Sequence, residues 1–203
     1  MFVKVCGLDT VANTRIAVDA GADAIGVVMS PRSPRHVTPE GAAAIIAEVQ
    51  GRATTVLVVR EMPAVEAARM AETMGVDVLQ LHGGRYAPED FTDALTVHPR
   101  IWRATSLTEA TDVRVGAWGE ERLLLDAPQA GSGERWDLNA LTARRPTGEW
   151  LLAGGLSPAN VADAITTAHP WGVDVSSGVE SAPGVKDPAL IQAFVAAARG
   201  TER

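Results

Sequence analysis

Eight short apolar runs recur along the whole chain and constrain the fold more than any other feature of the sequence. Each run is four to six residues long and rich in Val, Ile or Leu, which is typical of a buried strand. Most segments between them carry Ala, Ile and Val at helical spacing, so the chain alternates strand and helix and predicts parallel strands with crossover helices. The runs occupy residues 2–6, 24–29, 54–59, 78–81, 100–105, 122–126, 150–153 and 172–175.

Signals at the helix ends agree with this pattern. Gly21 and Gly75 stand where helices should end, because glycine readily adopts the left-handed conformation of a helix C-terminus. A capping side chain also stands before a proline suited to the first helical turn at three places: Thr38-Pro39, Ser157-Pro158 and Asp187-Pro188.

The phrases GADAIGVV, GVDVLQLH and GVDVSSG repeat one unit, a helix-ending Gly, a short turn with Asp and then a strand. Eight such units predict a (β/α)₈ or TIM barrel, and 203 residues lies near the lower length limit of that fold, roughly 200 residues. We therefore expect one domain over residues 1–203. The rival is an open doubly wound sheet, which usually carries G-x-G-x-x-G after its first strand, where this chain has CGLDT.

Composition narrows the functional classes. A net charge of −7 offers no electrostatic footprint for nucleic acid or an anionic membrane, and no stretch approaches the roughly 18 apolar residues of a membrane span. The lone cysteine, Cys6, forms no internal disulfide, and charged residues fill the N-terminus where a signal peptide would be apolar. We expect a cytoplasmic protein. The four histidines are scattered, so the sequence predicts no metal site.

In a barrel the site lies at the C-terminal ends of the strands. Cys6-Gly7, Asp126 and the segment SPRSPRHV (30–37) follow predicted strands at these ends. So do QLHGG (80–84), GGL (154–156) and SSG (176–178).

Together these motifs resemble the phosphoribosylanthranilate isomerase family of tryptophan biosynthesis, in order and over essentially the whole chain. The resemblance rests on KVCGL, GADAIGVV with SPRSPRHV, VLQLHG, LLLDA with GSG, LLAGGLSPANV, and GVDVSSGVE with GVKD. It departs at AGSGERWDL and at VLVVREMP, where the family's third strand usually ends in a Phe-containing run. The resemblance implies an Amadori rearrangement of a phosphorylated aminosugar that carries anthranilate, with no cofactor.

The same resemblance implies that Cys6 is the base and Asp126 the acid of the rearrangement. A thiol of ordinary pKa, about 8.5, needs help to ionise near neutrality. Strands 1 and 6 are three steps apart around an eight-membered ring, so the two side chains can face each other across the mouth. Without the resemblance, Cys6 would be read as a small core residue and Asp126 as a turn residue.

The remaining expected site residues bind the substrate. Arg35 matches the family arginine that grips the anthranilate carboxylate, with Arg32 the weaker candidate, and Gln80 and His82 share one face of their strand. Gln80 and His82 either form hydrogen bonds with the substrate or with Arg35, or they have a purely structural role. Backbone N–H groups should bind the phosphate, because glycine lets the chain approach closely. These come from Gly154, Gly155, Ser177 and Gly178, with Ser176 and the 131–133 turn nearby.

One expectation comes from strand alternation alone. If Cys6 points inward, so does Lys4, and if Ser176 points inward, so does Asp174 on the neighbouring strand of a closed barrel. A buried lysine is costly unless it is paired. We therefore predict a Lys4–Asp174 pair beneath the site, which favours the Cys6 thiolate in part or leaves Asp174 to contact substrate hydroxyls.

Two alternatives stay open. A related aminoaldose-phosphate isomerase, of the histidine pathway or of the bifunctional type, would use an aspartate where this chain has Cys6. A non-catalytic barrel could bind a phosphorylated ligand, but a binding protein needs no proton-transfer pair. We expect a monomer, because the sequence shows no exposed apolar stripe.

Overall fold

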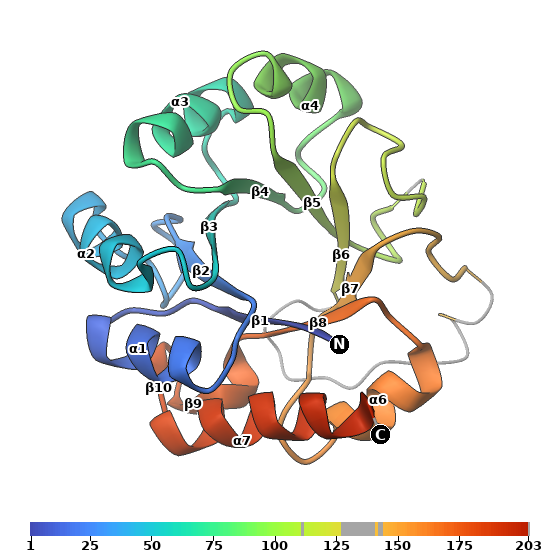
Figure 1. Ribbon diagram of the computed structural model, residues 1–203. Helices are drawn as coiled ribbons and strands as arrows, with labels where there is room; N and C mark the ends of the chain where they lie inside the picture. Colours follow the sequence, from blue (N-terminus) through green and yellow to red (C-terminus); the bar gives the residue numbers. More distant parts are fainter. Residues whose placement is uncertain (111, 127–140, 142–143, 203) are drawn as a thin grey trace.

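The computed structural model is a closed barrel of eight parallel strands in the order β1 to β8, with the helices on its outside (Figure 1). It describes residues 1–110, 112–126, 141 and 144–202. The strands are β1 (Phe2–Cys6), β2 (Ala24–Val28), β3 (Thr54–Val59), β4 (Val78–His82), β5 (Ile101–Ser106), β6 (Arg122–Asp126), β7 (Trp150–Leu152) and β8 (Gly172–Val175). Each predicted strand is confirmed to within one residue at either end, and the closed ring overturns the open-sheet alternative.

The outer layer consists of α1 (Val11–Asp19), α2 (Pro39–Val49), α3 (Ala64–Met74), α4 (Pro88–Leu95), α6 (Val161–Ala168) and α7 (Pro188–Arg199). Short 3₁₀ helices, η1 (Ser177–Val179) and η2 (Gly200–Glu202), and a hairpin of β9 (Glu180–Ala182) and β10 (Val185–Lys186) follow β8. None of the described helices is long and apolar enough to cross a membrane.

The predicted helix ends hold at most places. Thr38 and Asp187 cap α2 and α7 with their side chains, and Gly75 ends α3 at φ 66°. The prediction at Ser157-Pro158 is wrong, because α6 begins only at Val161. The Asn160 side chain accepts a bond from the Ser157 N–H and donates to the Gly155 carbonyl, so these residues form a turn instead.

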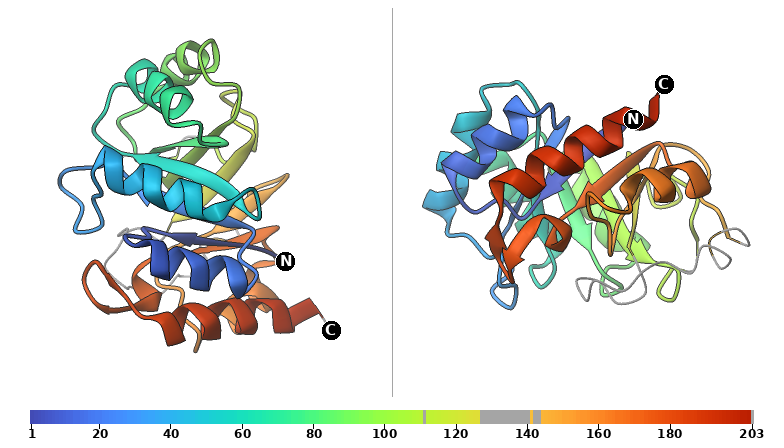
Figure 2. Two further views of the ribbon diagram at one scale, coloured as in Figure 1. Left: turned by 60° about the vertical axis from the view of Figure 1, so that its left-hand side comes forward. Right: turned by 90° about the horizontal axis from the view of Figure 1, so that it is seen from below.

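The ring closes between the first and last strands. Parallel pairing places Lys4 opposite Asp174, and α1 packs beside α7. Both views in Figure 2 show the chain termini close together, and Arg199 donates to the Met1 carbonyl at 3.0 Å. Because β1 and β8 are neighbours, residues 170 positions apart in sequence meet inside the barrel.

The barrel interior changes character along its axis. At the end where the strands start, the Phe2 ring stacks on Trp171, with centroids 4.5 Å apart, and meets Trp102 edge-on at 6.1 Å. Apolar side chains such as Val56 and Leu151 fill the middle. At the other end the inward positions become polar. The interior is therefore sealed at one end and can open only at the C-terminal ends of the strands.

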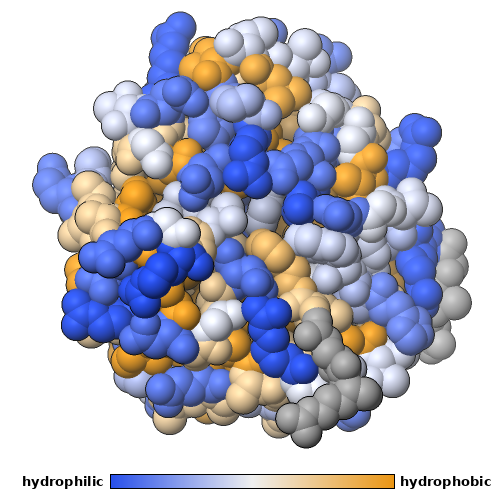
Figure 3. Space-filling model, viewed as in Figure 1, coloured by the Kyte–Doolittle hydropathy of each residue, from blue (hydrophilic) through white to orange (hydrophobic). Residues whose placement is uncertain are grey.

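Large apolar side chains are mostly covered in the described part of the chain. Val185 is the one large hydrophobic side chain exposed among the described residues. On the face seen in Figure 3, hydrophilic residues predominate and apolar ones are scattered between them.

Candidate active site

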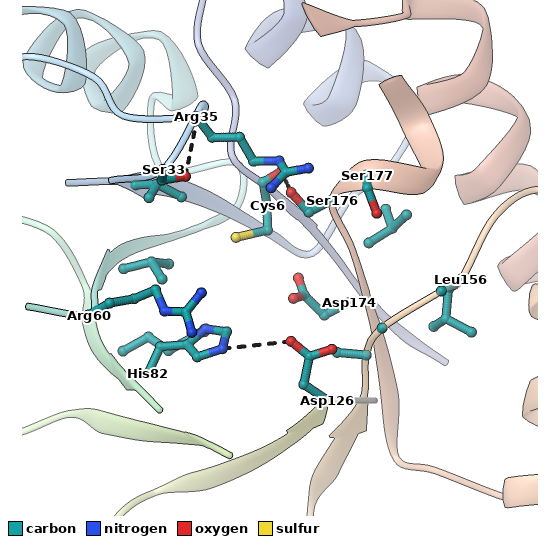
Figure 4. A pocket seen from close by; sticks show the side chains of 17 residues that line it. Cys6, Ser33, Arg35, Arg60, His82, Asp126, Leu156, Asp174, Ser176 and Ser177 are labelled. Carbon is teal, nitrogen blue, oxygen red and sulfur yellow. Dashed lines mark hydrogen bonds and ion pairs between the residues drawn. The ribbon is translucent and has the colours of Figure 1, made fainter. Parts of the chain in front are cut away.

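A cavity opens at the C-terminal ends of the strands and collects ten of the eleven site residues expected from the sequence (Figure 4). They are Cys6, Arg35, Gln80, His82, Asp126, Gly154, Gly155, Asp174, Ser176 and Ser177. The eleventh, Gly178, is not part of the lining.

Cys6 and Asp126 end strands β1 and β6, and both line the cavity. Cys6 is 7% exposed and Asp126 8% exposed, so a bound molecule rather than bulk water would be their main contact. Gly26 on β2 makes room for the thiol, because a Cβ atom there would lie 2.9 Å from Cys6 Sγ. The cavity thus holds a thiol and a carboxyl group on opposing strands, as the strand count predicts.

The predicted buried pair beneath Cys6 is present. Lys4 Nζ lies 2.8 Å from Asp174 Oδ1, and Lys4 is fully buried. Burial alone would lower the pKa of Lys4, but attraction to Asp174 and to Cys6 outweighs it and raises the pKa. Lys4 is therefore a cation inside the barrel, directly below the thiol.

Cys6 itself rests as a thiol. Burial raises its pKa, and the charge of Asp174 raises it further, while Lys4 and Lys186 act in the opposite direction. Lys4 thus favours the thiolate as expected, but burial and the charge of Asp174 outweigh its effect. Positive charge added beside Cys6 would lower this pKa.

Asp126 faces a neutral side chain, His82, rather than a lysine. His82 Nε2 lies 3.6 Å from Asp126 Oδ2, and Figure 4 shows the two side chains facing each other. Burial, with the nearby charges of Arg60 and Lys4, lowers the pKa of His82 to about 3, so its imidazole is neutral near pH 7. His82 faces Asp126 here rather than Arg35.

Gln80 lies beside His82 on β4, 1% exposed, at the inner part of the cavity. Its Oε1 atom has no hydrogen-bond partner among the described residues. A buried acceptor without a partner is costly, and a ligand hydroxyl or N–H group would satisfy it.

Arg35 is held by a network that the sequence reasoning missed. Its Nε and Nη2 atoms donate to the two Glu180 oxygens at 2.6 and 2.9 Å. Lys186 Nζ reaches the same carboxylate at 2.7 Å and also donates to the Ser176 carbonyl. Burial opposes ionisation of Glu180, but the bonds from Arg35 and Lys186 outweigh it and lower its pKa to about 2.

The two glycine loops lie side by side after β7 and β8. Gly154 and Gly155 both have positive φ, 82° and 64°, which favours glycine and exposes backbone to the cavity. Gly178 has a different reason to be glycine, since a Cβ there would lie 1.7 Å from the Leu156 carbonyl oxygen. It lets the β8 loop pack against the β7 loop. The 131–133 turn lies outside the described residues.

Comparison with known proteins gives this geometry a family. The sequence profile of the N-(5'phosphoribosyl)anthranilate (PRA) isomerase family matches residues 3–197. A relative from Geobacter sulfurreducens, an N-(5'-phosphoribosyl)anthranilate isomerase, is 41% identical, with 98% of each chain covered. The chain belongs to the phosphoribosylanthranilate isomerase family.

Solved structures of this family superpose closely. The crystal structure of TrpF from Jonesia denitrificans is 60% identical, has a TM-score of 0.92, and is matched over 98% of its chain and 99% of this one. A phosphoribosyl anthranilate isomerase in complex with reduced 1-(o-carboxyphenylamino)-1-deoxyribulose 5-phosphate is 28% identical, with a TM-score of 0.82 and 98% of this chain and 99% of that one covered. The TIM barrel predicted from the sequence is therefore confirmed.

Within the isomerase fold, three lining or supporting residues escaped the sequence reasoning. Arg60 follows β3 directly and lines the cavity. Its position at the C-terminal end of a strand could have indicated that it belongs to the site. Glu180 and Lys186 lie in the motifs GVDVSSGVE and GVKD, but nothing in their spacing indicates that both reach Arg35 or Ser176.

Proposed function

We propose that Cys6 and Asp126 carry the two proton transfers by which this chain isomerises N-(5'-phosphoribosyl)anthranilate. The chain is an isomerase of tryptophan biosynthesis, as its family profile and its full-length relatives establish. The residue roles rest on one observation above all. A buried thiol and a buried carboxyl group end β1 and β6 and line the same cavity.

The first step opens the sugar ring. Asp126, carrying a proton, donates it to the ring oxygen as the bond from C1 to that oxygen breaks, and the anthranilate nitrogen supplies the electron pair that forms an iminium. The neutral His82 imidazole, 3.6 Å from Asp126, adds no positive charge that would favour loss of the proton from Asp126 before the reaction.

The second step removes the proton from C2. The iminium is the electron sink, so the C–H electron pair becomes the C1–C2 double bond and the nitrogen becomes neutral. Cys6 Sγ accepts this proton as a thiolate, favoured by the new cation and by Lys4 below it. The resulting enolamine gains a proton at C1 and loses one from the C2 hydroxyl, which gives 1-(2-carboxyphenylamino)-1-deoxyribulose 5-phosphate without an external oxidant or reductant.

The other lining residues hold the substrate between these groups. We assign the phosphate to the backbone N–H groups of Gly154, Gly155 and Ser177, with Ser176 beside them, because glycine loops after β7 and β8 are the usual phosphate site of this barrel. Gly178 contributes by packing the two loops together.

Three further groups are assigned to other parts of the substrate. Gln80 offers its unpartnered acceptor, and Asp174 faces the cavity beside Cys6, where it can contact a hydroxyl group. Arg35 is assigned to the anthranilate carboxylate.

Loss of substrate fluorescence on conversion tests this function. The purified chain is given phosphoribosylanthranilate and, separately, the aminoaldose substrate of the histidine pathway. We expect turnover of the first and none of the second, because the base is a cysteine rather than an aspartate. Turnover of both would show a bifunctional enzyme, and turnover of neither would contradict the function.

We also propose that the chain acts as one domain and as a cytoplasmic monomer. The single barrel supports one domain, and the exposure of only Val185 among the large hydrophobic side chains of the described residues supports a monomer. A solved relative from Thermotoga maritima, 29% identical, is a dimeric enzyme. A mass measured by light scattering at micromolar concentration should equal one chain, 21.3 kDa. Twice that mass would contradict the proposal.

A further inference from the structure

The cavity has a glycine side and an arginine side. The glycine loops after β7 and β8 form one wall, and the loops after β2 and β3, carrying Arg35 and Arg60, form another. The substrate also carries two anionic groups, the phosphate and the anthranilate carboxylate, at opposite ends. If the glycine loops hold the phosphate, the carboxylate points to the arginine side.

Arg35 cannot serve that carboxylate with its full guanidinium. Its Nε and Nη2 atoms already form a two-point pair with Glu180, and Glu180 is fixed in turn by Lys186 and by the Gly184 N–H. Only Nη1 has no bond within the described part of the chain. Turning Arg35 away from Glu180 would break both bonds of this pair and leave the buried carboxylate with only Lys186 and the Gly184 N–H, which is unfavourable.

Arg60 has the opposite character. It follows β3 directly, is exposed at the mouth of the cavity, and forms no ion pair or hydrogen bond with the described residues. Figure 4 shows its guanidinium beside the His82 ring on the wall across from Ser177. The adjacent Glu61 carboxylate accepts a bond from Ser30 Oγ and forms no ion pair with Arg60.

The backbone that carries Arg60 is held on both sides. The Glu61 carbonyl accepts a bond from Arg85, and the Met62 carbonyl accepts one from the Tyr86 hydroxyl at 2.9 Å. Tyr86 is 4% exposed, so this anchor belongs to the protein core. Arg60 therefore projects an unpaired guanidinium into the cavity from a fixed position, which lowers the entropy lost when it binds.

We infer that Arg60 is a binding residue for the substrate's anthranilate carboxylate, acting with the one free edge of Arg35. The inference rests on the proposed function. An unpaired guanidinium matches a carboxylate with two parallel hydrogen bonds, so Arg60 supplies the two-point contact that Glu180 denies to Arg35. Arg60 thereby selects substrates with an acidic ring substituent.

Two matched ligands test this assignment. One is reduced 1-(o-carboxyphenylamino)-1-deoxyribulose 5-phosphate, and the other is the same molecule without its carboxyl group. We expect wild type to bind the first about 10- to 100-fold more tightly, the range of one charge-assisted contact. Arg60→Met should lose most of that preference by weakening only the carboxylated ligand, and Arg60→Lys should keep part of it.

Arg69→Met is the matched control, since Arg69 is an exposed arginine on α3 and does not line the catalytic cavity or the groove beside it. It should bind both ligands as wild type does. For Arg60→Met, KM for phosphoribosylanthranilate should rise about 10- to 100-fold while kcat changes only a few-fold. If Arg60→Met weakens the binding of both ligands equally, or of neither, the Arg60 assignment is overturned. Turnover by the wild type would still support the function in that case. A wild type that converts no substrate and binds neither ligand overturns both.

Discussion

The two sides of the catalytic cavity differ in the charge of the side chains that support them. On the Cys6 side, ion pairs are stacked from β1 to the hairpin after β8, with Lys4 on Asp174 at 2.8 Å and Lys186 on Glu180 at 2.7 Å. On the Asp126 side, the groups that β4 contributes are a neutral imidazole and an amide. The thiol that must become an anion lies close to Lys4 and Lys186, whereas the imidazole that faces Asp126 is neutral.

Within the cavity and its support, the buried ion pairs lie on the Cys6 side. Buried ion pairs cost desolvation, so their concentration on one side indicates that the thiol is the harder group to activate. Burial raises the pKa of Cys6, and Lys4 and Lys186 limit that rise. The following variants break this asymmetry at one side at a time.

The largest effect is expected from the reacting groups themselves. Cys6→Ser and Asp126→Asn should each lower kcat by about 10²- to 10⁴-fold, the usual contribution of a positioned acid or base. Turnover is followed by loss of substrate fluorescence. Both variants should still bind the reduced product analogue, so near-normal turnover in either one would contradict its role.

The next effect is on stability and is confined to the Cys6 side. Lys4→Met leaves Asp174 buried without its partner and should lower the free energy of unfolding by about 3–5 kcal/mol. The midpoint of urea unfolding measures this. Lys4→Met combined with Asp174→Leu should recover a large part of the loss, and a double variant that is less stable than Lys4→Met would refute the pairing.

A smaller, pH-dependent effect follows from the raised pKa of Cys6. Because the reactive form is the thiolate, its fraction should rise about tenfold per pH unit until the pH passes a value above the ordinary 8.5. Alkylation by iodoacetamide reports this cleanly, since Cys6 is the sole cysteine. His82→Asn, on the other side of the cavity, should shift the midpoint of the alkylation curve by no more than a few tenths of a pH unit. A Cys6 thiol that titrates below pH 8 would contradict the account.

The smallest effect concerns the support of Arg35. The pKa of Glu180 is lowered to about 2, so its ion pairs stabilise the fold fully above its ordinary pKa of 4.5 and are lost as pH falls toward 2. Glu180→Gln should therefore lose less stability than wild type between pH 5 and pH 2, as measured by urea midpoints. KM should rise only a few-fold, because glutamine can still accept a bond from Arg35. If the stability of Glu180→Gln falls between pH 5 and pH 2 as steeply as that of wild type, Glu180 is not the titrating group.

The fold was open to prediction because its signals are local and repeated. Apolar runs of strand length gave the eight strands, and the period of two along β1 and β8 placed Lys4 opposite Asp174. The Ser157-Pro158 helix start failed because the Asn160 side chain bonds back to the turn. The propensity of a single position does not reveal such competing side-chain contacts.

The site was predictable in its positions and not in its contacts. Strand ends indicate which residues reach the mouth, and these include Gln80 and His82. The pairing of Arg35 with Glu180, 145 positions away, depends on how two loops meet in space, which no spacing encodes. For the same reason the sequence does not show that Arg60 is unpaired or that Gly178 is glycine to admit the Leu156 carbonyl.

The most direct test of the central claim is the isotope effect on kcat/KM with phosphoribosylanthranilate deuterated at C2. The account predicts a larger effect in Cys6→Ser than in wild type, because removal of the C2 hydrogen becomes the slowest step. It predicts a suppressed effect in Asp126→Asn, because ring opening breaks no bond to that hydrogen. Equal isotope effects in the two variants, or the reverse order, would contradict the assignment of Cys6 as base and Asp126 as acid.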